Sequence, residues 1–348
     1  MDNDGVRVEK VEACILCGAP GQTLYGAHRD RLFNAPGAWS HLSCRKCGLV
    51  WLNPQPVAAD IPKLYANYAT HGPEASAISL SPNNPGLRHK VLKFVQAAYY
   101  GYATKDIGWL GHHFGRVVGL LSLVRDWAGS ALMFLPRMRG RLMDVGCGDG
   151  RFLAVMREEG WQVLGVEPDP EAAHRAREEY HIEVVAGTLG DAALPGNSVD
   201  AITMHHVIEH VPDPIALFRE CGRILRPGGS LVMITPNVES LGHRRFGENW
   251  RGLEPPRHLF LFSRGTLGAC ARISGLEIVS LRTISRLGRE IHLFSLALSG
   301  TREHLPRRVR FSRADRFRSW VFLLVEEVVR LLNGKAGEEV VLIARRPS

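Results

Sequence analysis

The sequence lacks any uninterrupted apolar run as long as a membrane span, and its N-terminal stretch MDNDGVRVEK lacks the apolar segment of a signal peptide. These absences argue against an integral membrane protein and favour a cytoplasmic location. The 348 residues are 45% hydrophobic, which suffices for one full α/β domain plus an appended module. Only the composition class of soluble globular proteins fits.

Acidic residues are scarcer than basic ones, with 35 Asp and Glu against 43 Lys and Arg, so the formal net charge is +8. This charge favours an acidic partner, which is a phosphorylated substrate, a membrane surface or a nucleic acid. Residues 302–318 contain seven arginines and two acids, ahead of an apolar helix pattern from Trp320 to Leu332. The stretch is either a solvated basic face or a peripheral membrane contact through residues 302–332.

Cysteine is also scarce, yet four of the seven cysteines form two C-x-x-C pairs that are each followed by glycine: Cys14, Cys17, Cys44 and Cys47. Two such pairs can supply four thiolates in a tetrahedron, so they predict a zinc ribbon. Disulfides are disfavoured in a reducing cytosol, and a redox pair would not occur twice. Four thiolates leave no open coordination position, so we expect structural zinc that supplies on the order of 10 kcal/mol of folding energy.

A glycine-rich turn separates two apolar runs in residues 141–170, which predict strand, turn, helix, strand and acid in that order. Glycines at alternate positions allow positive φ and let a ligand lie against bare backbone. The second strand ends at Glu167, where a carboxylate can accept hydrogen bonds from ribose hydroxyls. The stretch predicts a nucleoside site, with the spacing D-x-G-x-G-x-G from Asp144 to Gly150 in place of the G-x-G-x-x-G of dinucleotide enzymes.

Strands and helices alternate from Arg141 onward. This alternation predicts an α/β fold with a doubly wound, mostly parallel seven-stranded sheet whose ligands bind at the carboxyl ends of the strands. The expected later strands are 182–186, 199–204, 230–235, 276–283 and 338–344, with helices at 171–180 and 214–225.

Helix-period apolar residues at 87–102 and 114–135 predict a helical cap over the mouth of the nucleotide domain. The alternative is a lid that contacts an apolar acceptor or a membrane. A short helix at 58–68 and a loop at 71–86 are expected before it. We therefore expect three parts: a zinc-ribbon module (1–70), a linker and helical cap (71–137), and the nucleotide domain (138–348) with a basic, helical insertion at 284–337.

Four features together resemble class I S-adenosylmethionine-dependent methyltransferases: the D-x-G-x-G-x-G run, the acid that ends the second strand, the lead Pro195–Asp200, and the turn Leu225–Gly229. The cysteine pairs followed by GLVWLNP are similar to a bacterial subgroup with an N-terminal zinc ribbon. That subgroup includes deoxysugar C-methyltransferases and enzymes of surface-polysaccharide and secondary-metabolite pathways. The run from His206 to His210 also resembles the E-x-x-E-H of ubiquinone-biosynthesis O-methyltransferases, although His206 stands where that group carries an acid.

The resemblance implies S-adenosylmethionine as cofactor and assigns residues to it. The glycine turn would cradle the methionine part and the sulfonium, Glu167 would hold the ribose diol, and Pro168 would lie beside the adenine. His205 would face the methionine end, and residues 187–189 fall where the family lines the adenine, often with an acid that this chain lacks. The implied cofactor residues are Asp144, Gly146, Cys147, Gly148, Gly150, Glu167, Pro168, Gly187, Thr188, Leu189 and His205.

Histidines provide the catalytic candidates, because removing the acceptor's proton suits a group whose pKa lies near working pH. His206, Glu209 and His210 follow the fourth strand, and His258 lies in the loop after the fifth strand, which in the resembled family closes over the acceptor. The structural alternatives are that Glu209 and His210 cap and orient their loop and that His258 makes a packing hydrogen bond. The string H-x-x-E-H also matches inverzincin proteases, but it follows a buried strand and is broken by prolines.

The leading hypothesis is a methyltransferase that acts on a small molecule, most plausibly a sugar hydroxyl or carbon on a nucleotide-linked or lipid-linked glycan. A second hypothesis is an RNA or protein methyltransferase that uses the ribbon for substrate binding. Against nucleic acid, the fourth strand is followed by Met204-His-His-Val and not by an N-P-P-Y-like motif. The ribbon also lacks interleaved arginines and aromatics. A non-catalytic binding protein is disfavoured by the intact glycine motif and ribose acid.

Overall fold

The computed structural model describes residues 1–65, 86–102, 107–138, 140–306 and 309–348. The chain divides into two units that each combine separate stretches of sequence. Unit 1 contains Met1–Ala69, His206–Arg219 and Ile234–Leu342, and unit 2 contains Thr70–His205, Glu220–Met233 and Ile343–Ser348. The expected division into 1–70, 71–137 and 138–348 stays a prediction.

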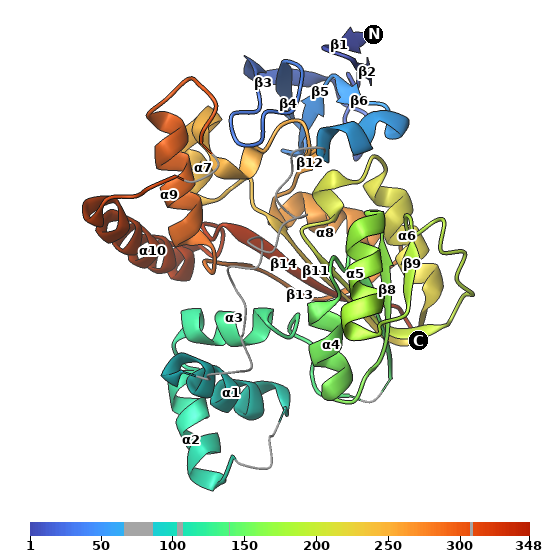
Figure 1. Ribbon diagram of the computed structural model, residues 1–348, viewed down its shortest axis with the longest axis vertical. Coiled ribbons are helices and arrows are strands. Elements are labelled where there is room, and N and C mark those ends of the chain that lie inside the picture. Colours follow the sequence, from blue (N-terminus) through green and yellow to red (C-terminus); the bar gives the residue numbers. More distant parts are fainter. Residues whose placement is uncertain (66–85, 103–106, 139, 307–308) are drawn as a thin grey trace. The chain divides into compact units, whose positions relative to one another are not determined.

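Two small sheets form the N-terminal part of unit 1 (Figure 1). One consists of β1 (Asp2–Asn3), β2 (Val6–Glu9) and β6 (Gln55–Pro56). The other has the order β12-β5-β4-β3, with β3 (Gly21–His28), β4 (Trp39–Cys44), β5 (Val50–Asn53) and β12 (Phe260–Leu261). Because β12 pairs with β5, a strand from late in the sequence completes the sheet that carries the cysteine pairs.

Three helices of unit 1, α7, α8 and α10, begin at serine caps. Ser312 and Asp315 form a capping box at the start of α10, and Gly334 ends that helix in the left-handed conformation. The predicted helix at 58–68 is a 3₁₀ helix that contains Pro62, and residues 66–68 lie outside the described part. The helices are η1 (Ala58–Tyr65), η3 (Ile208–His210), α7 (Leu241–Phe246), η4 (Gly247–Asn249), η5 (Arg251–Leu253), α8 (Arg264–Ile273), α9 (Gly288–Ser299) and α10 (Arg313–Asn333).

A seven-stranded sheet has the order β13-β14-β11-β10-β7-β8-β9, which confirms the predicted mostly parallel α/β sheet. The pairs of β7 with β8, of β7 with β10 and of β8 with β9 are parallel. Leu142, Met143 and Ile202 are fully buried, as expected of strands covered on both faces. The strands are β7 (Arg141–Val145), β8 (Gln162–Glu167), β9 (Val184–Ala186), β10 (Val199–His205), β11 (Leu225–Pro236), β13 (Glu277–Ile284) and β14 (Glu339–Arg345).

Helices connect these strands as predicted. Asp169 caps the N-terminus of α5 by accepting a hydrogen bond from Glu171 N, and Pro170 occupies the first turn. The helices are α4 (Arg151–Glu158), α5 (Pro170–Tyr180) and α6 (Pro214–Ile224).

Three helices precede the sheet in unit 2: α1 (Leu87–Tyr100), α2 (Trp109–Val118) and α3 (Ser122–Ser130). The helix-period residues at 114–135 are divided between two helices, because the chain turns at Gly119, between α2 and α3. Gly115 in α2 lies so close to α1 that an added Cβ would meet the carbonyl oxygen of Phe94. Glycine at this position is therefore what allows the two helices to pack against each other.

Two side-chain contacts show where the three helices that were predicted as a cap meet the sheet domain. Lys93 of α1 pairs with Glu159 at 3.5 Å, and the Trp161 indole donates to the Tyr102 hydroxyl at 3.4 Å. Glu159 and Trp161 follow the last turn of α4 and precede β8, so they mark the amino ends of the strands. These contacts attach the helices at the amino ends of the strands and not at the carboxyl ends, where the cap was expected.

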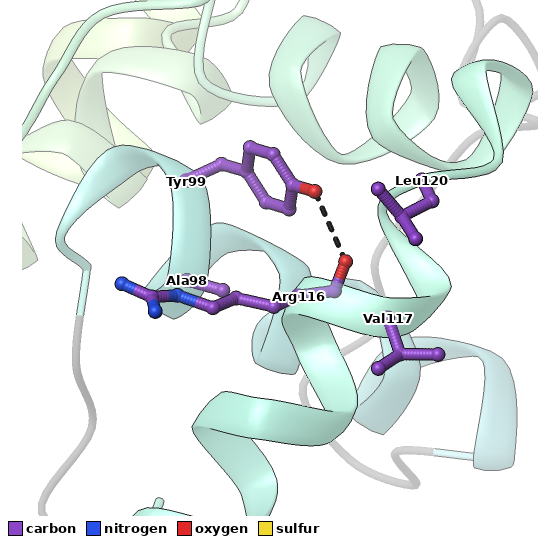
Figure 2. Close-up of a pocket in the computed structure, with 5 residues that line it drawn as sticks. All are labelled: Ala98, Tyr99, Arg116, Val117 and Leu120. Carbon is purple, nitrogen blue, oxygen red and sulfur yellow. Dashed lines mark hydrogen bonds between the residues drawn. The ribbon is translucent and has the colours of Figure 1, made fainter.

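A shallow hollow of about 330 Å³ lies on these helices, lined by side chains of α1 and α2 and by Leu120 (Figure 2). The hydroxyl of Tyr99 donates to the backbone carbonyl of Arg116 across it. None of the residues predicted for the functional site lines this hollow. Among the helices of the described ranges, none combines the length and the apolar character needed to cross a membrane.

Candidate functional site

The glycine turn after β7 has the conformation that its sequence predicts. Gly146, Gly148 and Gly150 all have positive φ, at 71°, 56° and 80°. A Cβ on Gly150 would meet Ala176 at 2.8 Å, so this glycine allows α4 and α5 to approach closely. A Cβ on Gly148 would meet nothing within 4 Å, so the backbone there is bare and open. Gly148 is therefore the point at which a ligand can lie directly on the main chain.

Glu167 at the end of β8 is tied to this turn. Its side chain is buried, and its Oε2 accepts a hydrogen bond of 2.8 Å from Gly148 N. The other oxygen accepts one of 2.9 Å from Asp169 N. A carboxylate offers acceptor sites on both of its oxygens. The geometry thus places an acceptor for hydroxyl groups beside the bare backbone of Gly148.

Asp144 at the end of β7 is the second buried acid of this region. Its Oδ1 accepts a hydrogen bond of 2.6 Å from the Thr203 hydroxyl. Burial raises the pKa of Asp144 to about 7, against the hydrogen bond from Thr203 and with help from the charge of Glu167. Cys147 is buried, and its Sγ lies where a Cβ on Gly165 would be, which agrees with a packing role. Asp144 is therefore poised to ionise when a positive charge approaches.

The segment after β9 contains an acid that the motif comparison missed. Gly187 has φ of 131°, and Leu189 is buried. The backbone and hydroxyl of Thr188 donate to one oxygen of Asp191 at 2.8 and 2.7 Å. Asp191 thus fixes the turn at residues 187–189, and the local Thr-x-x-Asp spacing was the signal for it. Pro168 is exposed, as is His205 at the end of β10.

His206, the first residue after β10, is held by two acids. Its Nδ1 lies 3.0 Å from Glu209 Oε1, and its Nε2 lies 3.0 Å from Glu339 Oε1. Burial lowers the pKa of His206, but the hydrogen bonds to these two carboxylates raise it to about 9. With both nitrogens donating, the ring is an imidazolium at neutral pH. His206 is therefore placed as a fixed cation and not as a proton acceptor.

The carboxylates around His206 are themselves paired. Arg286 donates to both oxygens of Glu339 at 2.7 and 3.1 Å, and the Thr235 hydroxyl donates to Glu209 Oε2 at 2.9 Å. Burial raises the pKa of Glu209, but the hydrogen bond and charge of His206 lower it to about 2. Glu209 is thus ionised and fully engaged.

His210 and His258 form an edge-to-face pair with ring centroids 4.8 Å apart. The Nδ1 of His210 lies 2.9 Å from the Arg257 carbonyl, and that of His258 lies 2.8 Å from the Gly252 carbonyl. A carbonyl only accepts, so each Nδ1 carries the proton and each Nε2 offers a lone pair. Burial lowers the pKa of His258 to about 4, with the charge of Glu254 opposing. His258 is therefore neutral, and the Nδ1 contact of each ring leaves its Nε2 as the position that can accept a proton.

A buried arginine fixes the loop that carries His258. The guanidinium of Arg257 donates to Asp30 at 2.9 and 3.0 Å and to Glu254 at 3.0 Å. Its side chain is fully buried, and the Tyr65 hydroxyl lies 3.0 Å from His210 Nδ1. Asp30 and Tyr65 come from the N-terminal stretch, so that stretch positions both histidines within unit 1.

The four paired cysteines come together as predicted. Their sulfur atoms lie within 4.8 Å of one another, with Cys14 to Cys47 at 3.5 Å and Cys17 to Cys44 at 3.4 Å. These distances are too long for disulfides and close to the roughly 3.8 Å edge of a tetrahedron with Zn–S bonds of about 2.3 Å. Gly18 and Gly48 have positive φ after each pair, as a knuckle turn requires. The thiols therefore fit a tetrahedral metal.

Among the described residues, a second group of possible metal ligands consists of Glu209, His210 and His258, with ligand atoms within 4.8 Å. Glu209 is already engaged by His206 and Thr235, as described above. The residues predicted to bind the cofactor all belong to unit 2, whereas the four catalytic candidates and the four thiols belong to unit 1.

Comparison with known proteins matches residues 123–281 to the family described as "Methyltransferase domain". A "Ubiquinone biosynthesis O-methyltransferase" of Xanthomonas campestris pv. campestris is 37% identical over 104 residues, which is 28% of this chain and 43% of that protein. A "Probable S-adenosylmethionine-dependent methyltransferase" of Mycobacterium tuberculosis is 36% identical over 104 residues, which is 29% of this chain and 38% of that protein. The chain thus spans less than half the length of these curated relatives.

Among solved structures, an S-adenosylmethionine-dependent methyltransferase of Mesorhizobium loti is similar with a TM-score of 0.44 and 20% identity. The alignment covers 64% of this chain and 97% of that chain.

Proposed function

We propose that this protein, which contains a class I S-adenosylmethionine-dependent methyltransferase domain, transfers a methyl group from that cofactor to a small-molecule acceptor. The observation that carries the proposal is the bare backbone at Gly148, with the Glu167 carboxylate bonded to it. S-adenosylmethionine supplies a methyl group already activated on its sulfonium. A carboxylate at the end of the second strand suits a ribose diol, and the open face of Gly148 suits the atoms next to it.

The pKa of Asp144 predicts how cofactor binding depends on pH. At a pKa of about 7, Asp144 is half protonated in the free protein at neutral pH. A bound sulfonium and ammonium favour the ionised carboxylate, so binding releases a proton and strengthens as pH rises through this pKa. We expect affinity to increase about tenfold from pH 5.5 to 7.5, measured by calorimetry.

Asp144→Asn provides the control for this pH dependence, because it keeps the shape and cannot ionise. The variant should bind more weakly at pH 7.5 and show a flat profile. A wild-type profile that is also flat would remove Asp144 from the cofactor site.

The transfer is an in-line displacement at the methyl carbon, and a hydroxyl or carbon acceptor must also lose a proton. We assign the general base to His210, whose ring is half-buried. Its Nδ1 proton is held by the Arg257 carbonyl, so its Nε2 carries the lone pair that can accept a proton. His258 packs edge-on against this ring, and its low pKa keeps it neutral. The contacts of His206 with Glu209 and Glu339 fix the turn between β10 and His210.

Replacing His210 by asparagine tests this assignment. The asparagine amide reproduces the Nδ1 donor toward Arg257 and removes the Nε2 lone pair, so the loop should stay in place. We expect kcat to fall by about 10²- to 10⁴-fold, with cofactor affinity unchanged. Single-turnover transfer of labelled methyl measures the chemical step.

His174→Asn serves as the matched control, because His174 is an exposed histidine of α5. It should leave the rate unchanged. If His210→Asn retains the full rate and the wild-type pH profile, then His210 only packs its loop.

For the acceptor we propose a sugar hydroxyl or carbon, nucleotide-linked or lipid-linked, in glycan or secondary-metabolite biosynthesis. The excess of basic residues and the resemblance of the cysteine module to sugar-pathway enzymes support this class. The name of the Xanthomonas relative, an O-methyltransferase of ubiquinone biosynthesis, adds hydroxyl acceptors of that pathway as a competing class. RNA or protein is the more distant alternative.

Incubation with labelled cofactor and a panel of nucleotide sugars, lipid-linked glycans, quinone precursors, RNA and protein distinguishes these acceptors. Label in the glycans supports the proposal, whereas label in RNA or protein alone overturns it. Label in quinone precursors alone keeps the methyltransferase and replaces the acceptor. For the four thiols we propose structural zinc, which would be held by Cys14, Cys17, Cys44 and Cys47.

A further inference from the structure

Helix α10 has one face that packs against its own unit. Phe322 contacts the His292 ring, with centroids 4.7 Å apart, and the Phe246 ring, with centroids 6.4 Å apart. Glu326 accepts a hydrogen bond of 2.9 Å from Glu338 N. Ser319 and Leu323 are buried on the same face. This face alone accounts for the attachment of α10 beside α9 (Figure 1).

The opposite face of α10 is also apolar, and it is exposed. At 100° per residue, its members fall within about 140° of the helix circumference. Leu324 is 61% exposed, Leu331 64% and Leu332 82%. A helix stabilised only by its protein contacts needs one apolar face, so a second one indicates a partner. The exposed face consists of Phe317, Trp320, Val321, Leu324, Val325, Val328, Leu331 and Leu332.

Basic side chains surround the N-terminal end of this exposed face. Arg313 lies within its arc, whereas Arg316 and Arg318 flank it on opposite sides. The Arg289 guanidinium lies over the Trp320 ring at 4.6 Å from its centroid. The single acid in the first two turns of α10 is Asp315, which caps the helix through Ser312 and pairs with Arg318 at 3.7 Å. The face is therefore apolar in its middle and cationic at one end.

We propose that the exposed face of α10 binds the surface of a bilayer that contains anionic lipids. The helix is about 30 Å long and would lie along the surface with its apolar side chains among the acyl chains. The arginines would meet lipid phosphates, and Trp320 has the amphipathic ring found at such interfaces. The buried face keeps α10 attached to its unit, so the helix lies on the bilayer and does not cross it.

A second copy of the chain is a poorer occupant of this face. In a parallel pairing, the arginine-rich ends of two helices would meet and repel each other. In an antiparallel pairing, each arginine-rich end would lie against Leu331 and Leu332, where α10 offers no free acid, since the nearby Glu327 is paired with Arg330 at 2.5 Å. The charge pattern is thus satisfied by phosphates and not by the same helix.

Co-sedimentation of the full chain with lipid vesicles tests the proposal. We expect binding to phosphatidylcholine vesicles that contain about 30% phosphatidylglycerol to be at least about tenfold stronger than binding to phosphatidylcholine alone, and to weaken at high salt. Leu324→Glu with Leu331→Glu should reduce binding to the anionic vesicles by at least about tenfold. Arg313→Gln with Arg316→Gln should lower the preference for anionic over neutral vesicles.

Ile273→Glu with Val279→Glu is the matched control, because both side chains are about half exposed, lie outside α10 and change the net charge equally. This control should bind as the wild type does. Absence of wild-type binding to either vesicle, or equal binding by the Leu324 and Leu331 double variant, overturns the proposal. A wild-type dimer in sedimentation velocity that the same double variant converts to a monomer identifies a second copy as the occupant and overturns it as well.

Discussion

Glu167→Ala is expected to weaken the binding of S-adenosylmethionine and of its demethylated product by about 100-fold or more. The substitution removes the carboxylate beside the bare backbone of Gly148 and also the acceptor that fixes Gly148 N. Each hydrogen bond to a charged group contributes about 1.5–3 kcal/mol, and the loss of two ribose contacts gives the expected factor. Titration calorimetry with both compounds measures it.

Two variants separate a loss of ligand contacts from a loss of structure. Glu167→Gln keeps the volume and one acceptor oxygen, so it should fall between wild type and alanine. Glu178→Ala removes an exposed acid of α5 in the same unit and should bind normally. If Glu167→Ala lowers the melting temperature but leaves affinity intact, the carboxylate holds only the turn and the cofactor lies elsewhere.

Cys14→Ser combined with Cys44→Ser is expected to abolish metal binding and to unfold the sheet β12-β5-β4-β3. The thiols lie where a tetrahedral zinc would hold two knuckles together, and such sites supply on the order of 10 kcal/mol. Because β5 pairs with β12, which directly follows the His258 loop, turnover should be lost as well. Cofactor binding should persist, since its residues belong to unit 2.

Metal analysis, circular dichroism and calorimetry together check this result. The wild type should contain one zinc per chain, and a strong chelator should reproduce the effect of the double variant. Cys270→Ser is the comparison, because Cys270 is a buried cysteine of α8 in the same unit, outside the cluster. It should keep the zinc. A metal-free wild type that folds and turns over normally would contradict a structural zinc.

The glycine turn after β7 was the most predictable part of the chain, because each of its properties is local. Glycines at 146, 148 and 150 permit the positive φ that the turn has, and the buried strand β8 ends at Glu167. The cysteine pairs were equally readable, since two C-x-x-C knuckles imply one cluster. In both cases, the spacing of a few residues in the sequence is enough to predict the local backbone conformation.

The charge state of His206 was not predictable, because its second acid is remote. Glu339 lies 133 residues further along the chain, and Arg286 fixes it from a third segment. Nothing near the His-x-x-Glu-His run shows that its first histidine is held by two carboxylates. The fold therefore argues against His206 as a base and leaves the candidates His210 and His258, of which we propose His210.

The pairing of β12 with β5 was also missed, and for a similar reason. Two residues, Phe260 and Leu261, are too short a run to predict a strand. The boundary between α2 and α3 was missed because apolar periodicity continues through Gly119. Local patterns thus found the elements that stand on their own and missed those that depend on partners far away in sequence.

The buried contact of Arg257 with Asp30 limits how this protein can be shortened or recombined. A chain trimmed to start after the cysteine module would leave a guanidinium sealed in the interior without one of its two counter-charges, and β12 without a neighbour. Exchanging the module for that of a related enzyme would demand an aspartate at the same depth. The amino-terminal stretch and the loop at 254–258 thus depend on each other, and a chimeric protein should take both from the same parent.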